Sequence, residues 1–122
     1  MQRIGEIRAV SDGTNAFVVS DADAGQELFT VSFPGSIIHK YFQIESDYLL
    51  QFQCRSPVAK EKGNLLFISC DGLIKWWAER RRSDDCYVEV NIQDNRIIGY
   101  DGSYECVIDS ATGRVLNREF RQ

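Results

Sequence analysis

Two stretches of the chain repeat the same order of turns and strands, and this repeat constrains the fold more than any other feature. In residues 12–28 an Asp-Gly turn opens a strand that ends in aspartate, and a second turn closes with glycine before the next strand. The same order returns in residues 101–116, so the repeat covers about 12–33 and 101–120. Turns that need glycine at positive φ between alternating strands are typical of a repetitive antiparallel β architecture.

Most of the remaining chain also alternates with the period of two that strands show. The clearest hairpin joins residues 65–70 to 73–79 through Asp71-Gly72. A chain of 122 residues makes one domain, 1–122, and is too short for a closed propeller at roughly 40 residues per blade. The sequence therefore predicts an all-β fold: antiparallel meanders of blade-like hairpins, packed as a β-sandwich or a partly closed barrel.

Three segments leave their structure open or irregular. Residues 37–44 and 73–82 fit a strand or a helix, because both contain apolar residues at spacings that suit either. Residues 55–64 contain Pro57 and a charged run, and we expect them to form the longest loop.

The overall charge limits the classes of partner. A formal net charge of -4 and a pI near 4.9 argue against a nucleic-acid ligand, which needs a basic face. No apolar run approaches the roughly 20 residues that cross a bilayer, and the first residues lack the apolar centre of a signal peptide. We therefore expect a cytoplasmic protein that contacts no membrane.

Residues that could support catalysis or hold a metal are sparse. The single histidine, His39, has no nucleophile and carboxylate pattern around it, and the alternating carboxylates of residues 21–27 lack ligands that a calcium loop requires. We expect no catalytic residue, no metal and no cofactor. The four cysteines lack zinc-ligand spacing, and we expect them to be reduced core residues, although disulfides between neighbouring strands stay possible. They are Cys54, Cys70, Cys86 and Cys106.

The C-terminal third is acidic, and alternation predicts where its charges point. In residues 86–92 the apolar set Cys86, Val88, Val90 and Ile92 should face the core, which places Tyr87 and Glu89 outside. In the repeat strand Glu105 should point outward. If residues 96–100 lie between these two strands, Glu89 and Glu105 share one side of one sheet. Such a face either keeps the protein soluble or docks a basic protein.

A basic run precedes this acidic region. Residues 80–82 are three arginines, and the flanking acids Glu79, Asp84 and Asp85 favour local neutralisation over phosphate binding. Of the adjacent Trp76 and Trp77, which point opposite ways in a strand, we expect one in the core and one at an edge.

Residues 102–116, GSYECVIDSATGRVL, resemble the blade hairpin of quinoprotein-like β-propellers, in which a strand ends in Asp and a short polar turn reaches Gly. Residues 12–33 resemble it more weakly. The resemblance implies blade-like hairpins, and no cofactor ligand of that family carries over.

In size, acidity and β content the chain also resembles immunity proteins of bacterial toxin systems, particularly those of contact-dependent growth inhibition. This resemblance implies a non-enzymatic protein that binds a cognate toxin domain, often a basic nuclease, and blocks it. The expected contact residues, chosen by charge and exposure, are Asp84, Asp85, Tyr87, Glu89, Glu105 and Asp109.

The alternative is a non-catalytic scaffold or subunit that assembles through open sheet edges, because an unclosed set of blades exposes unpaired strands.

Overall fold

The computed structural model describes residues 4–9, 15–21 and 26–121, which form eleven strands and one short helix. The strands are β1 (Ile4–Ala9), β2 (Ala16–Asp21), β3 (Glu27–Ser32), β4 (Ile38–Ile44), β5 (Asp47–Phe52), β6 (Leu65–Ile68), β7 (Ile74–Trp77), β8 (Glu89–Gln93), β9 (Arg96–Tyr100), β10 (Tyr104–Ile108) and β11 (Val115–Phe120). The helix, α1 (Pro57–Glu61), lies between β5 and β6.

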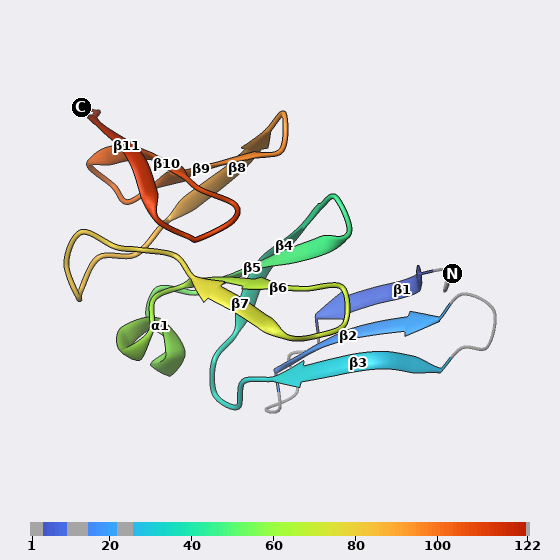
Figure 1. Ribbon diagram of the computed structural model, residues 1–122. Helices are drawn as coiled ribbons and strands as arrows, with labels where there is room; N and C mark the ends of the chain where they lie inside the picture. Colours follow the sequence, from blue (N-terminus) through green and yellow to red (C-terminus); the bar gives the residue numbers. More distant parts are fainter. Residues whose placement is uncertain (1–3, 10–14, 22–25, 122) are drawn as a thin grey trace.

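The strands form three separate antiparallel sheets, each a meander of consecutive strands (Figure 1). The N-terminal sheet has the order β1-β2-β3, the middle sheet β4-β5-β6-β7, and the C-terminal sheet β11-β10-β9-β8. The predicted all-β class of antiparallel meanders is confirmed. Of the two packings considered, the described residues form stacked sheets, as in a sandwich, and no closed barrel.

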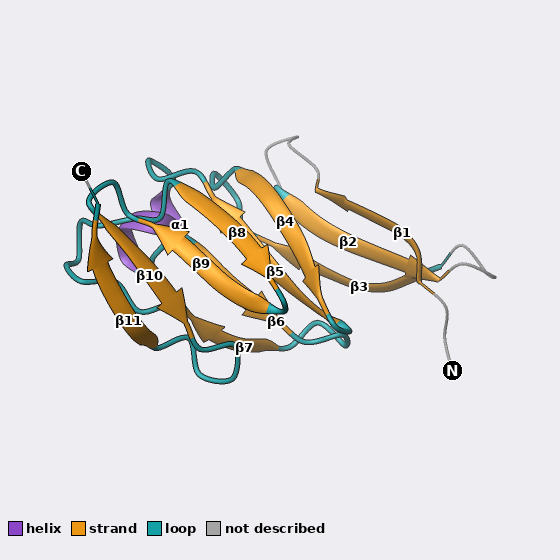
Figure 2. Ribbon diagram, turned by 90° about the horizontal axis from the view of Figure 1, so that it is seen from above, coloured by secondary structure: helices purple, strands orange, loops and turns teal. Residues whose placement is uncertain are grey.

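The middle sheet packs against the other two sheets, one on each face (Figure 1). From above, the C-terminal sheet lies over the middle sheet and the N-terminal sheet extends to one side (Figure 2). Alternate residues of β5 supply the two cores: Leu49 joins the core under the C-terminal sheet, while Tyr48, Leu50 and Phe52 join the core under the N-terminal sheet. Since every residue of β5 after Asp47 is buried, this strand is covered on both faces.

The two adjacent tryptophans of β7 divide between these cores as alternation requires. Trp76 is buried in the core under the C-terminal sheet, where it stacks on Phe67 at 4.9 Å between ring centroids. Trp77 is half-buried and packs edge-on against Phe33 at 6.2 Å in the other core. The prediction of one core tryptophan is confirmed for Trp76, while Trp77 is half-buried and packs against the second core.

Aspartate and glycine close the hairpins at the predicted places. Gly72 has a φ of 87° in the turn between β6 and β7, so the Asp71-Gly72 hairpin is confirmed. Before β10, Asp101 accepts hydrogen bonds from the backbone N–H groups of Ser103 and Tyr104, and Gly102 has a φ of 96°. The carboxylate thus stabilises a tight turn, as Asp commonly does.

The two halves of the internal repeat both fold as antiparallel hairpins. The pair β10–β11 closes through Asp109, whose carbonyl accepts from the N–H of Gly113 at 2.7 Å. The pair β2–β3 closes after Asp21, whose N–H donates to the carbonyl of Gln26 at 2.7 Å. Residues 12–13 and 22–25 of the first copy, including most of the calcium-like pattern, lie outside the described part of the chain.

The sequence analysis left the structure of two segments open and predicted a third one incorrectly. Residues 38–44 form a strand, and 73–82 form a short strand that ends at Trp77 and continues as an irregular segment. The prediction that residues 55–64 form only a loop is wrong, because Pro57 starts α1; proline suits the first helical turn, where its missing N–H has no partner to lose.

A disulfide joins Cys54 to Cys86, with their Cα atoms 5.8 Å apart. The expectation of four reduced cysteines is therefore wrong for this pair. Both residues lie outside the strands to which alternation assigned them: Cys54 follows β5 and Cys86 precedes β8, in segments that the stacking of the sheets brings within disulfide range. Cys106 is free and buried as expected, whereas Cys70 is free but exposed, so the expected core position is wrong for Cys70.

Candidate binding surface

Four side chains form a row across the outer face of the C-terminal sheet, the face opposite to its core. Glu89 of β8 and Glu105 of β10 both pair with Tyr100 of β9, and Glu105 pairs on its other side with Glu119 of β11. Residues directly opposite each other in a sheet project to the same face. The prediction that Glu89 and Glu105 share one side of one sheet is confirmed, because β9 lies between their strands.

A charged network connects three members of this row. The Tyr100 hydroxyl donates to Glu105 Oε1 at 2.9 Å, and Arg121 Nη2 lies 2.8 Å from Glu105 Oε2 and 3.7 Å from Glu119 Oε2. The hydrogen bonds from Arg121 and then from Tyr100 lower the pKa of the Glu105 carboxyl, and the bond to Glu105 raises the pKa of Tyr100. The row therefore carries a negative charge that Arg121 offsets only in part.

Glu119 belongs to this surface although the sequence analysis did not select it. Its side chain is 58% exposed and shares its cation with Glu105. The signal was present, because β11 follows β10 in the second copy of the repeat and a hairpin register would have placed an outward glutamate opposite Glu105. We call Glu89, Tyr100, Glu105 and Glu119 the acidic row.

The other expected contact residues lie elsewhere. Asp109 closes the β10–β11 turn, where its carboxylate accepts from the Ala111 N–H at 3.1 Å and the Thr112 hydroxyl at 2.9 Å. Asp84 is exposed and Asp85 half-buried in the segment before β8, where Asp85 pairs with Arg81 at 3.5 Å. These three carboxylates are therefore not part of the acidic row.

The predicted exposure of Tyr87 is wrong. Tyr87 is buried in the core under the C-terminal sheet, and its hydroxyl donates to the carbonyl of Glu79. The alternation that placed it outside does not apply, because β8 begins only at Glu89 and the preceding residues run irregularly. As a result Val88, predicted to face inward, is exposed.

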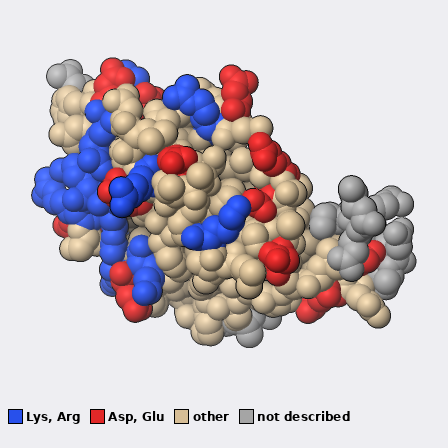
Figure 3. Space-filling model, in the orientation of Figure 1, with Lys and Arg blue, Asp and Glu red and all other residues tan. Residues whose placement is uncertain are grey.

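Two of the three arginines after β7 hold the irregular segment to its surroundings through their side chains. Arg80 donates through Nη1 to the carbonyl of Ala59 at 2.9 Å, at the end of α1. Arg81 lies 4.7 Å from the ring centroid of Tyr104 and pairs with Asp85. Figure 3 shows Lys and Arg gathering on the left of the molecule, where Figure 1 places α1 and this segment. The Arg81–Asp85 pair agrees with the predicted local neutralisation.

A cleft of about 410 Å³ opens beside the disulfide. Its walls come from the end of β5 with α1 on one side and from the segment before β8 on the other. The lining residues are Cys54, Arg55, Ala59, Lys60, Ser83, Asp84, Asp85 and Cys86. The cleft thus combines a disulfide, two cations and two carboxylates.

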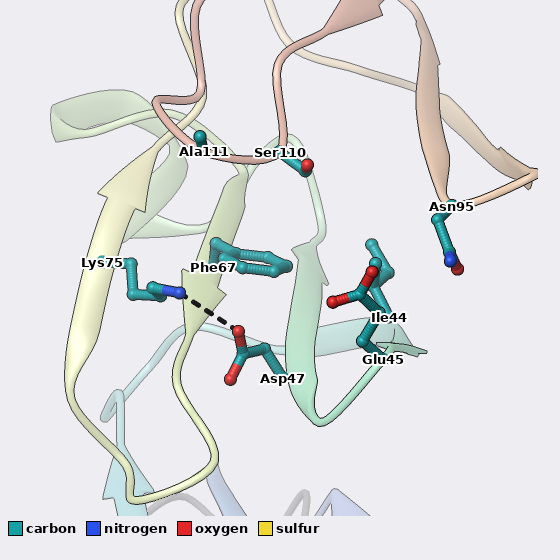
Figure 4. A pocket seen from close by; sticks show the side chains of 8 residues that line it. All are labelled: Ile44, Glu45, Asp47, Phe67, Lys75, Asn95, Ser110 and Ala111. Carbon is teal, nitrogen blue, oxygen red and sulfur yellow. Dashed lines mark hydrogen bonds and ion pairs between the residues drawn. The ribbon is translucent and has the colours of Figure 1, made fainter.

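A smaller hollow of about 210 Å³ lies where three hairpins end, with Phe67 and Ile44 at its base (Figure 4). Lys75 Nζ pairs with Asp47 Oδ2 at 3.1 Å on one side, and the backbone of Glu45 opposite has a φ of 56°. Its lining contains neither histidine nor cysteine, so proton transfer here would depend on carboxylates and one lysine.

Groups that could hold a metal are not gathered in the described residues, where no three His, Cys, Asp or Glu side chains come together. His39 lies exposed on β4. In the same described part of the chain, no helix is long and apolar enough to span a bilayer.

The fold defines a small all-β protein of stacked antiparallel meander sheets. The chain belongs to the family described as a domain of unknown function, DUF7957, whose model matches residues 24–120. This match covers the middle and C-terminal sheets and, of the N-terminal sheet, only β3. No curated protein matches the sequence.

Proposed function

We propose that this protein is an immunity protein that binds a cognate bacterial toxin domain, of the contact-dependent growth inhibition kind, and blocks it without catalysis. The observation that carries the proposal is the acidic row, which presents three carboxylates and one tyrosine on one face of one sheet. A basic nuclease domain fits such a face, since complementary fields accelerate association and suppress wrong partners. We propose that the protein acts in the cytoplasm. Its acidic row would cover the surface with which the toxin binds the phosphates of its substrate.

On binding, a cation of the partner would replace Arg121 as the ion-pair partner of Glu105. Arg121 holds Glu105 at 2.8 Å but is itself 53% exposed, so it can swing away when a lysine or arginine of the partner approaches. Tyr100 keeps Glu105 oriented through its 2.9 Å hydrogen bond, and Glu89, exposed beside it, has no ion pair among the described residues. Tyrosine is also among the residues most enriched at the centre of protein interfaces.

The test is capture of the partner from its own host, followed by direct binding with the purified partner at low and high salt. We expect a basic polypeptide whose affinity falls steeply with ionic strength. Glu89→Lys plus Glu105→Lys should weaken binding at least tenfold, in the range known for close interfacial charge pairs. Glu45→Lys plus Glu61→Lys, which reverses two exposed glutamates away from the row, should leave the affinity unchanged. Equal losses in both double variants would refute the acidic row as the docking surface.

A second candidate function, assembly through open sheet edges, is favoured by β11. This strand pairs only with β10 in the described residues, and its Leu116 and Phe120 are 67% and 60% exposed. Edge strands with exposed apolar side chains readily accept another strand. A salt-resistant oligomer in size-exclusion chromatography with light scattering, abolished by Phe120→Lys, would support this function over toxin binding.

A further inference from the structure

The cleft beside the Cys54–Cys86 disulfide shares no lining residue with the acidic row and has a chemistry of its own. Both cysteines are half-buried and line the cleft, so a small molecule inside it lies beside the disulfide. The volume of about 410 Å³ lies in the range of small-ligand pockets. The lining places Arg55 and Lys60 on one wall and Asp84 and Asp85 on the other.

The charges of the lining select the kind of molecule that fits. Asp85 is paired with Arg81, whereas Arg55, Lys60 and Asp84 have no ion pair among the described residues. Two free cations and one free carboxylate complement a ligand with two carboxylates and one ammonium group. Glutathione, a peptide thiol, has these groups together with a sulfur that can react with a disulfide.

From this match we propose that the cleft binds a zwitterionic peptide thiol of the glutathione type and that Cys54–Cys86 is a reversible thiol–disulfide exchange site. Disulfides that a thiol can reach are more often labile or regulatory than fully buried structural ones. The site lies apart from the acidic row, and the inference does not depend on the proposed function.

The exchange proceeds in two balanced steps. The thiolate of one glutathione attacks Cys86 Sγ, a bond forms between these two sulfurs, the Cys54–Cys86 bond breaks, and its electron pair leaves on Cys54 Sγ, which takes a proton from water. Cys54 is the better leaving group because it shares the cleft wall with Arg55 and Lys60, and cations stabilise a thiolate. A second glutathione then attacks the glutathione sulfur on Cys86, so that glutathione disulfide departs and Cys86 becomes a thiol.

The surrounding hydrogen bonds allow this exchange without unfolding. Asn64 Nδ2 donates to the Tyr87 carbonyl at 2.7 Å, and the Tyr87 N–H donates to Asn64 Oδ1 at 2.9 Å. Gln51 Nε2 also donates to the Tyr87 carbonyl, at 3.2 Å. These bonds join the residue after Cys86 to the middle sheet independently of the sulfur bridge, so the reduced segment stays in place for reoxidation.

The experiment follows the reaction of the folded, oxidised protein with glutathione by intact mass after acid quenching, in a Cys70→Ser background that removes the exposed free thiol. We expect an adduct of one glutathione, located on Cys86 by peptide mapping, and then the dithiol form with unchanged far-UV circular dichroism. Arg55→Glu plus Lys60→Glu should slow the reaction with glutathione roughly tenfold, the lower end of electrostatic effects on encounter rates.

Two controls keep this outcome specific. The thiol 2-mercaptoethanol carries neither the carboxylates nor the ammonium group of glutathione, so the Arg55→Glu plus Lys60→Glu change should slow it less than glutathione, through the loss of leaving-group stabilisation at Cys54 alone. Lys40→Glu plus Arg96→Glu, which makes the same charge change at exposed positions of β4 and β9, should react with glutathione as the wild type does. The proposal is overturned if both double variants slow equally, or if exchange in the wild type is no faster than global unfolding.

Discussion

Asn64 and Tyr87 bond to each other twice, side-chain amide to backbone peptide, across 23 positions of the sequence. Asn64 Nδ2 donates to the Tyr87 carbonyl at 2.7 Å and Asn64 Oδ1 accepts from the Tyr87 N–H at 2.9 Å. Asn64 Nδ2 also lies 3.1 Å from the Phe52 carbonyl. Tyr87 lies outside the strands, and the Asn64 amide bonds its backbone N–H and carbonyl as a neighbouring strand would.

Removing this amide should destabilise the protein strongly. Asn64→Ala leaves the buried N–H of Tyr87 without its partner and removes one donor each from the Tyr87 carbonyl, which keeps Gln51, and from the Phe52 carbonyl. An unsatisfied buried group costs about 1–3 kcal/mol. We expect a loss of about 3–5 kcal/mol in the free energy of unfolding, measured by urea denaturation. Asn117→Ala, at an exposed position of β11, should change it by no more than about 0.5 kcal/mol. Comparable losses in both would contradict the assignment.

Gly99 makes room for the Tyr87 ring. A Cβ at position 99 would lie 2.5 Å from Tyr87 Cδ1, closer than any real contact. Gly99→Ala should therefore cost about 1–3 kcal/mol, the usual range for overpacking a core. In a Tyr87→Ala background the same substitution should cost almost nothing, and the double-mutant cycle measures the difference. Simple additivity of the two variants would rule out the steric explanation.

Alkaline pH should unfold the protein through Tyr87. Burial raises the pKa of its phenol, so the folded state holds the proton more tightly than the unfolded state does. The resulting stability is complete below the unfolded pKa of about 10 and is lost as the pH rises above it. Tyr87→Phe should flatten the fall in melting temperature above about pH 10 relative to wild type. An equally steep fall in the variant would assign the effect to other groups.

Acid titration should reveal the contact between Arg121 and Glu105. Hydrogen bonds from Arg121 and Tyr100 lower the pKa of Glu105, so this pair stabilises the fold above the unfolded pKa and the contribution fades as the pH falls through the folded value. Arg121→Gln should raise the pKa of Glu105, followed by NMR of the side-chain carboxyl carbons. Arg114→Gln, at an exposed site before β11, serves as the control and should leave that pKa where it is in wild type.

Loss of the disulfide should weaken the protein but leave it folded. The bridge closes a loop of 32 residues in sequence separation, for which chain entropy predicts about 3–4 kcal/mol. Cys54→Ser plus Cys86→Ser should lower the free energy of unfolding by that amount. The near-UV circular dichroism of this double variant should still show packed aromatic side chains, because the hydrogen bonds between Asn64 and Tyr87 persist. Loss of that signal at 25 °C would show that the disulfide is required for folding.

The strands and turns were predictable from sequence because each depends on neighbouring residues. Period-two alternation located the strands, and the three Asp-Gly pairs indicated turns, of which Asp71-Gly72 and Asp101-Gly102 lie in the described part of the chain. The shared face of Glu89 and Glu105 followed from the same alternation, since a meander places β9 between their strands.

The contacts between sheets were not predictable in this way, because they depend on which sheet packs on which. Alternation placed Tyr87 outside and Val88 inside, whereas the chain between β7 and β8 crosses from one sheet to the next and turns Tyr87 into the core. The Cys54–Cys86 bridge depends on the same crossing, so no local pattern indicated it. Glu119 needed a register between two hairpin strands that the repeat could have supplied.

The double-sided burial of β5 has a consequence for how this family can change its sequence. Leu49 and Leu50 are adjacent in the chain, yet each packs against a different outer sheet. A substitution at Leu49 favours compensating changes in the C-terminal sheet, and a substitution at Leu50 favours compensating changes in the N-terminal sheet. The sequences of the N-terminal and C-terminal sheets can therefore diverge independently, and β5 is the strand whose residues must stay compatible with both.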